Sequence, residues 1–190
     1  MDGKKCRKYM ETSQTAPLLK IIDRERSGED IQIATEKEKI VSPFIEVLRE
    51  ITMANIILGT GHVSVQEIKK LVEEAKKIGI KKILVNHPEL NIINMFLKDQ
   101  IDLAKKGVYF ERCFFVATPL GQRMDPAKIA EAIRTVGPES TILATDLGQV
   151  DNPSPVERLQ SYIRSILKRG ITKEEIEIMV RVNPLRLING

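Results

Sequence analysis

The sequence predicts an α/β protein built from parallel strand-helix units, and three observations lead to this class. Short apolar segments alternate with amphipathic helical segments four times between residues 55 and 170. A glycine ends several of the helical segments shortly before the next apolar one, as at Gly79 and Gly107. The apolar segments are nearly continuous rather than alternating, which is typical of parallel strands covered on both faces.

The first third of the chain is expected to hold an arm, a short strand and a helix. Residues 1–30 are polar and basic and are expected to form an N-terminal arm, whereas residues 31–190 form one domain. Residues 31–35 alternate as a strand does, and a charged turn follows them. Ser42 and Pro43 are placed to begin a helix over residues 44–53, with Ser42 as its cap.

Regular strand-helix units follow. A strand at 55–58 leads into Gly59-Thr60-Gly61-His62, and Ser64 caps a helix that Gly79 ends. One face of that helix is apolar and consists of Val65, Ile68, Leu71, Val72 and Ala75. The next unit pairs a strand at 82–85 with a helix at 92–106.

The remaining units run to the end of the chain. A strand at 108–116 precedes a long loop, and Asp125-Pro126 begins a helix that ends near residue 136. The strand that starts at Thr141 carries Asp146 at its end, and a helix at about 156–169 follows. Thr172 and Glu175 have the spacing of a capping box for a last helix to about residue 182, after which Asn183-Pro184 turns the chain into a final apolar segment.

Composition limits the setting and the partners. A chain of 190 residues with 42% hydrophobic and 29% charged residues is long enough for one domain with a real core. The net charge of +4 is spread among glutamates along helical segments, which is typical of solvated helix faces and disfavours nucleic acid as a partner. No apolar run approaches the roughly 18 residues that cross a membrane, and the N-terminus lacks a signal-peptide pattern.

Cysteine usage fits a cytoplasmic protein. The two cysteines, Cys6 and Cys113, do not make a disulfide framework, and no spacing resembles a zinc knuckle. Cys113 follows an apolar pattern and has no nearby cysteine or histidine in the sequence. It is therefore interpreted as a buried core thiol.

Four polar residues follow predicted strands, at the edge where parallel βα folds gather their ligand sites. They are His62, His87, Glu111 and Asp146, and the chain has no other histidine. Imidazole and carboxylate groups are ligands that zinc prefers, and a carboxylate can also accept the proton of a metal-activated water. Each residue alone has a plainer interpretation, since histidines after strands often pack and aspartates there often cap helices.

The motifs at these strand ends also carry a family resemblance. They are Gly59-Thr60-Gly61-His62, Asn86-His87-Pro88, Glu111, residues 144–149 and Asn183-Pro184. Over residues 31–190 they resemble the later half of a metal-dependent (βα)8-barrel hydrolase of the amidohydrolase superfamily. The resemblance implies a partial (half) TIM barrel that hydrolyses an amide or ester bond of a small molecule through a metal-activated water. It implies His62, His87 and Asp146 as metal ligands, with Asp146 also as general base.

Further expectations follow from the residue types and from the resemblance together. Zinc is the expected ion, with iron or manganese as alternatives. Glu111, Glu89 and Gln149 are additional candidate site residues, and Glu36 or Glu38 could replace a carboxylate that the family carries on its fourth strand. Gln122 and Arg123, in the loop over residues 117–124, could contact an anionic substrate.

The chain also departs from the family pattern. The family's His-x-His pair on the first strand has no counterpart, because only two histidines are present. A half-barrel leaves strand edges and an inner face to be covered, so a homo-oligomer is expected, or else a rearrangement of the N-terminal arm across the gap or a partner chain that supplies the other half. The alternatives to a hydrolase are a catalytically inactive relic or assembly subunit, and a module that binds anions at helix N-termini.

Overall fold

The centre of the molecule is a parallel sheet whose strands follow one another in chain order. The structure is a computed structural model that describes residues 33–34, 40–148, 152 and 154–190. Its four strands are β1 (Leu58–Gly59), β2 (Ile83–Asn86), β3 (Tyr109–Cys113) and β4 (Thr141–Ala144). Each strand pairs in parallel with the next. In a doubly wound sheet the strand order reverses part-way along the chain, whereas in a (βα) barrel each strand lies next to the one that follows it in sequence. The predicted α/β class is therefore confirmed, and the strand order is that of a partial TIM barrel.

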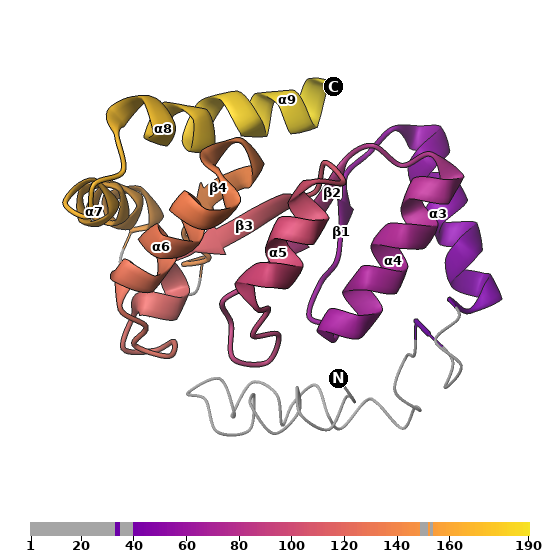
Figure 1. The fold of residues 1–190 in the computed structure, drawn as a ribbon, viewed down its shortest axis with the longest axis horizontal. Coiled ribbons are helices and arrows are strands. Elements are labelled where there is room, and N and C mark those ends of the chain that lie inside the picture. Colours follow the sequence, from indigo (N-terminus) through magenta and orange to yellow (C-terminus); the bar gives the residue numbers. More distant parts are fainter. Residues whose placement is uncertain (1–32, 35–39, 149–151, 153) are drawn as a thin grey trace.

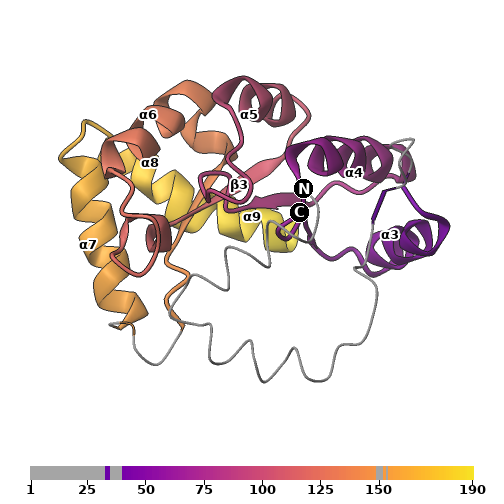
Figure 2. The same ribbon diagram turned by 90° about the horizontal axis from the view of Figure 1, so that it is seen from below.

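Helices cover one face of this sheet. They are α4 (Val65–Ile78), α5 (Leu97–Ala104), α6 (Pro126–Val136) and α7 (Pro155–Leu167). Figure 2 shows α4, α5 and α6 along the same side of the strands. Ile83, Val85 and Phe110 pack against α4 and α5, and Leu143 packs against α6 and α7. The main apolar core therefore lies between the sheet and these helices.

The opposite face of the sheet is less covered. Along β2 and β4 every second residue is buried, and the residues between them are only partly buried. Register places the partly buried residues on one face, which we call the inner face. It consists of Leu84, Asn86, Tyr109, Glu111, Ile142 and Ala144. This face corresponds to the interior of a closed barrel.

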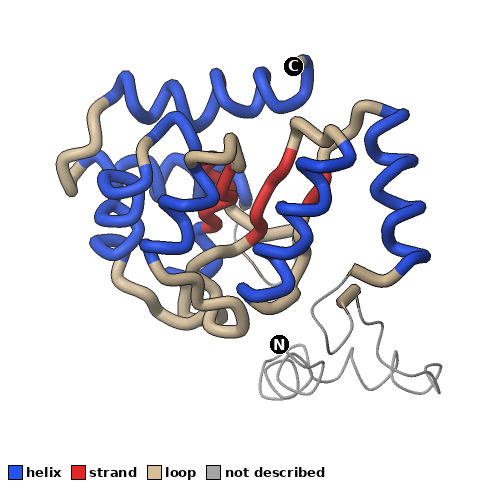
Figure 3. The backbone as a smooth tube through the Cα atoms, turned by 45° about the vertical axis from the view of Figure 1, so that its right-hand side comes forward, coloured by secondary structure: helices blue, strands red, loops and turns tan. Residues whose placement is uncertain are grey.

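The C-terminal helices lie across the starts of the strands. They are α8 (Lys173–Glu177), the π-helical segment η3 (Ile178–Val182) and α9 (Asn183–Asn189), and Figure 3 shows them following one another as one helical run. The buried Lys82 donates from Nζ to the carbonyl oxygens of Ile188 at 3.0 Å and Asn55 at 3.2 Å. Asn55 follows helix α3 (Ser42–Ala54), so this lysine joins the C-terminal ends of two helices at the edge remote from the histidines.

Local capping explains where several elements begin. Ser64 and Glu67 form a capping box at the start of α4, and Gly79 ends that helix in the left-handed conformation. Asp125 accepts a hydrogen bond from the Ala127 amide at the start of α6. Thr172 and Glu175 form the predicted second capping box, at α8. These boundaries are confirmed because short-range hydrogen bonds fix them.

Two predicted elements are shorter than expected because the chain turns beside them. The strand expected at 55–58 is confined to Leu58–Gly59, since Asn55 ends α3 with φ 50°. The helix expected at 92–106 begins only at Leu97. There Asn94 adopts φ 47° and the Met95 amide donates to the carbonyl of Pro88 at 2.9 Å, which holds the preceding residues in turns.

The strand expected at 108–116 is also shorter, because its last part is helical. It ends at Cys113, and Phe114–Ala117 forms the 3-10 turn η1, whose Phe115 amide donates to the carbonyl of Thr145 at 3.0 Å. A second 3-10 turn, η2 (Pro138–Ser140), leads into β4.

Ser42 and Asn183 also differ from expectation. Val41 rather than Ser42 is the N-cap of α3, and it makes no side-chain capping bond. Asn183 does not end the last helix, because α9 continues from η3. The amide of Asn183 donates to Ile178 five residues back, so Pro184, which has no amide hydrogen, falls where the helical bonding pattern changes. The side-chain Nδ2 of Asn183 donates to the carbonyls of Pro138 and Thr141, both at 2.7 Å.

Some expectations concern residues that the structure does not describe. The N-terminal arm, the turn with Glu36 and Glu38, and Gln149 lie outside the described residues. From the strand expected at 31–35, Ala34 makes an antiparallel bridge with Ile40. Within the described part of the chain, no helix is both long and apolar enough to cross a lipid bilayer.

Candidate metal centre

The polar residues singled out in the sequence lie at the carboxyl ends of neighbouring strands. His62 follows β1, His87 directly follows β2, Glu111 lies within β3, and Asp146 follows β4 by two residues. The rings of His62 and His87 stack with their centroids 5.1 Å apart and an interplanar angle of 10°. Two loops that are 25 residues apart in sequence therefore meet at this edge of the sheet.

Asn86 connects these loops through its side chain. Its Oδ1 accepts from the amide of Gly61 at 3.1 Å, and its Nδ2 donates to Glu111 Oε2 at 2.7 Å. Gly61 adopts φ 61°, and a Cβ atom at Gly59 would lie 3.0 Å from Asn86 Oδ1. The Gly-x-Gly spacing before His62 thus serves a tight turn and a close approach, and Asn86 orients the Glu111 carboxylate.

The backbone is strained at two of the candidate metal ligands. His87 has φ 49° and Asp146 has φ 54°, which is the left-handed region that residues with a Cβ rarely adopt. Such positions cost on the order of 1–3 kcal/mol each, and they cluster at functional sites. Both strained residues follow a strand directly or by two positions, where the chain must turn the side chain back over the sheet edge.

Three side chains approach one another closely enough to share a metal ion. His87, Cys113 and Asp146 each offer a ligand atom, and these atoms all lie within 4.8 Å of one another. Donors around a tetrahedral zinc ion lie roughly 3.3–3.8 Å apart, so the group would close by at most about 1.5 Å. His62 is not part of this group, although its ring covers that of His87.

Cys113 is the member of this group that sequence reasoning assigned to the core. It is buried, with 2% of its surface exposed, and it is a free thiol. It lies two residues after Glu111 in the same strand, and its Cα partner in the neighbouring strand is Ala144. Because side chains alternate along a strand, the Glu-x-Cys spacing was a usable signal that both residues face the same side.

The site residues change one another's protonation. Burial lowers the pKa of His62 from its ordinary value, and His87 lowers it further, whereas Asp146 and Glu111 oppose this change. Desolvation raises the pKa of Asp146, against the effect of His87, and Glu111 adds to the rise. Burial likewise raises the pKa of the Cys113 thiol. Without a cation, the edge therefore favours neutral imidazole and thiol groups.

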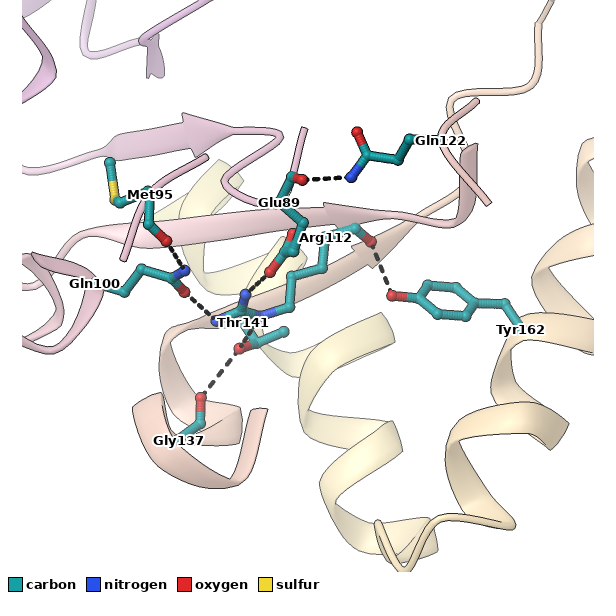
Figure 4. A network of polar contacts seen from close by, with 8 residues as sticks. All are labelled: Glu89, Met95, Gln100, Arg112, Gln122, Gly137, Thr141 and Tyr162. Atoms are coloured by element: carbon teal, nitrogen blue, oxygen red, sulfur yellow. Dashed lines mark hydrogen bonds and ion pairs between the residues drawn. The ribbon is translucent and has the colours of Figure 1, made fainter. Parts of the chain in front are cut away.

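A buried polar network lies behind this edge, on the helix-covered side of the sheet (Figure 4). Its centre is Arg112, whose side chain is fully buried and pairs with Glu89 through Nη1. Arg112 Nη2 donates to Gln100 Oε1 at 2.8 Å, and its Nε donates to Thr141 Oγ1 at 3.4 Å. Sequence reasoning did not single out Arg112, because its partners come from positions 12 to 29 residues away.

The remaining candidate residues occupy different surroundings. Glu89 was a candidate site residue, and its carboxylate lies in the Arg112 network. Gln122 holds the same loop, since its Nε2 donates to the Glu89 carbonyl at 2.7 Å and its Oε1 accepts from the Asn91 amide at 2.8 Å. Arg123 is exposed and adopts φ 52°.

Comparison with known proteins places the chain in a family. Residues 1–111 match the model of a family of unknown function, DUF6282, and this match covers more than half of the chain. The chain belongs to the DUF6282 family. No curated protein matches this DUF6282 chain.

A solved structure shares the fold. It is the crystal structure of N-acetyl-D-glucosamine-6-phosphate deacetylase from Mycobacterium smegmatis, with a TM-score of 0.50 and 15% sequence identity. The similarity covers 77% of the DUF6282 chain and 42% of the deacetylase chain. At this identity the likeness concerns the fold alone, and the chain spans less than half the length of that enzyme.

Proposed function

We propose that this protein is a metal-dependent hydrolase that acts on an amide or ester bond of a small molecule. The observation that carries the proposal is the approach of His87, Cys113 and Asp146 within 4.8 Å at the carboxyl edge of a barrel-type sheet. The fold similarity to a deacetylase of an N-acetylated sugar phosphate supports it, since removing an N-acetyl group breaks an amide bond.

The residues present fit a divalent metal ion. His87 and Asp146 offer nitrogen and oxygen donors, and the ring of His62 stacks on that of His87 beside them. Burial and the neighbouring His87 lower the pKa of His62, which favours a neutral ring next to a cation. Bound there, zinc, or alternatively iron or manganese, would supply a Lewis acid that activates water near neutral pH.

The chain's own carboxylates would manage the proton. Desolvation raises the pKa of Asp146 against the effect of His87, and Glu111 adds to the rise, which favours proton acceptance by this carboxylate. Asn86 holds Glu111 by a hydrogen bond of 2.7 Å, so one oxygen of that carboxylate is fixed towards the site. Asp146 is thus proposed as general base, with Glu111 setting its charge.

Metal content of purified protein tests the proposal. We expect near-stoichiometric zinc, iron or manganese in the wild type and a clear loss in His87→Gly, because glycine relaxes the φ of 49° while it removes the imidazole. Asn94→Gly is the matched control, since Asn94 has φ 47° and lies outside the site. Equal metal content in wild type and His87→Gly, with both folded by circular dichroism, would contradict the proposal.

An assembly role is the second candidate function, and the inner face favours it. Leu84, Tyr109 and Ile142 are only partly buried on this face, although apolar barrel interiors are normally filled. A second copy of the chain would provide four more parallel strands, which completes the number in a (βα)8 barrel. We therefore propose a homo-oligomer.

The mass in solution tests this assembly. A dimer that becomes monomeric in Tyr109→Asp, without loss of helical content, is the expected result. Stable monomers at micromolar concentration would refute self-association.

A cytoplasmic setting is also proposed, because a reducing compartment keeps Cys113 a free thiol.

A further inference from the structure

The end of β3 places a sulfur atom among the candidate metal ligands. Cys113 lies one strand from His87 and one strand from Asp146, because β3 runs between β2 and β4. Its Cα partner in β4 is Ala144, two residues before Asp146. The ligand atoms of the three residues lie within 4.8 Å of one another.

The surroundings of this thiol are unusual for a core cysteine. It is buried, yet its neighbours include the polar residues Glu111 and Asp146, whose charges reach it. Within the described ranges it is a free thiol. A purely structural thiol packs just as well among apolar groups alone, whereas a metal ligand needs other donor groups beside it, as His87 and Asp146 are here.

We propose that Cys113 is a ligand of the metal ion, in a mixed His87, Cys113 and Asp146 set. This inference rests on the proposed function for the presence of a metal, but the sulfur ligand is independent of any catalytic activity. As the metal-sulfur bond forms, the S–H bond breaks and its proton passes to solvent, so the metal charge is partly neutralised by the thiolate.

The proposed ligand set determines which ions are accepted. Thiolate and imidazole favour zinc and similar borderline ions, whereas magnesium, calcium and manganese prefer oxygen ligands alone. With His62 stacked on His87 outside the set, these three protein ligands leave a fourth tetrahedral position for water or substrate, as in catalytic zinc sites. Cys113 would thereby provide a third ligand in a chain that has only two histidines.

Cobalt substitution tests the sulfur ligand by spectroscopy. Metal-free protein is titrated with Co(II), and the near-ultraviolet sulfur-to-cobalt charge-transfer band is recorded alongside bound cobalt by elemental analysis. We expect the band in the wild type and in Cys6→Ser, and no band in Cys113→Ser. Since the chain has two cysteines, the band in Cys6→Ser assigns the ligand to Cys113 even if Cys113→Ser folds poorly.

The outcomes separate this inference from the function on which it rests. Stoichiometric cobalt without the charge-transfer band would overturn the sulfur ligand and leave the metal site in place. Absence of bound cobalt and zinc in the wild type would overturn the metal site and the sulfur ligand together. Zinc binding should also weaken roughly a hundredfold or more in Cys113→Ser, because even residues that only support ligands change affinity 10–100-fold.

Discussion

Replacing Arg112 with methionine should cost the protein about 3–5 kcal/mol of unfolding free energy. Arg112 is fully buried and its guanidinium contacts Glu89, Gln100 and Thr141. Methionine fills much of the same space, so the main loss is electrostatic. Glu89 would keep a buried carboxylate without its partner, and its Oε2 already lacks a hydrogen bond within the described chain. Removing one member of a buried ion pair typically costs this amount.

Urea unfolding followed by circular dichroism measures the effect. For a protein of this size, the loss corresponds to a fall in Tm of about 6–20 °C, at roughly 2–4 °C per kcal/mol. The double variant Arg112→Met/Glu89→Gln should recover most of the loss, because it removes the unpaired charge. The control is Arg181→Met, which breaks an exposed pair with Glu177 and should change stability by less than about 0.5 kcal/mol.

Two results would refute this reasoning. A loss of 1 kcal/mol or less in Arg112→Met would mean that the pair contributes no more than a surface ion pair. Failure of Glu89→Gln to rescue stability would mean that lost packing, rather than the unpaired carboxylate, causes the damage. Since Glu89 lies two residues after His87, the single variant should also weaken metal binding more than Arg181→Met does.

Three other perturbations have expected signs. Tyr162→Phe should lose about 0.5 kcal/mol at pH 7, because the Tyr162 hydroxyl donates to the Arg112 carbonyl at 3.4 Å. Burial raises the pKa of Tyr162, so above pH 10 the hydroxyl proton is lost only from the unfolded wild type. The free energy of unfolding of the wild type therefore falls by about 1.4 kcal/mol per pH unit in this range. By pH 11, urea titrations should show that Tyr162→Phe is the more stable protein. Asp146→Gly should be about 1 kcal/mol more stable than Asp146→Ala in thermal unfolding, because only glycine adopts φ 54° without strain. Equal stabilities of the two variants would argue against backbone strain at this position. Ser64→Ala removes the capping box of α4 and should lower the free energy of unfolding by about 1 kcal/mol. An unchanged free energy of unfolding in urea titrations would show that the cap is dispensable.

Local signals in the sequence were sufficient for the class and for many boundaries. Ser64, Asp125 and Thr172 each cap a helix through a neighbour at most three residues away, so their effect is readable from spacing alone. The helix before Leu97 was overpredicted because Ile92 and Ile93 are apolar at helical spacing. Both residues contact the core, but they do so from turns, which are held by the left-handed backbone of Asn94 and by the hydrogen bond from the Met95 amide to the Pro88 carbonyl.

The candidate site was predictable only in part, for a related reason. Strand ends indicated the edge at which His87 and Asp146 lie, because all parallel strands present their carboxyl ends together. Placing Cys113 beside Asp146 required the register between β3 and β4. The Arg112–Glu89 pair joins residues that are 23 positions apart in sequence. Neither of these can be obtained from hydrophobic patterns along one segment.

The left-handed backbone at His87 and Asp146 also has an evolutionary consequence. A single nucleotide change converts aspartate to glycine or asparagine, and histidine to asparagine, and these residues suit φ values near 50° better. If the site had no use, such changes would be gains in stability that nothing opposes. If the proposed site is in use, related chains should therefore keep histidine and aspartate at these two positions, whereas glycine or asparagine there would favour an inactive relic.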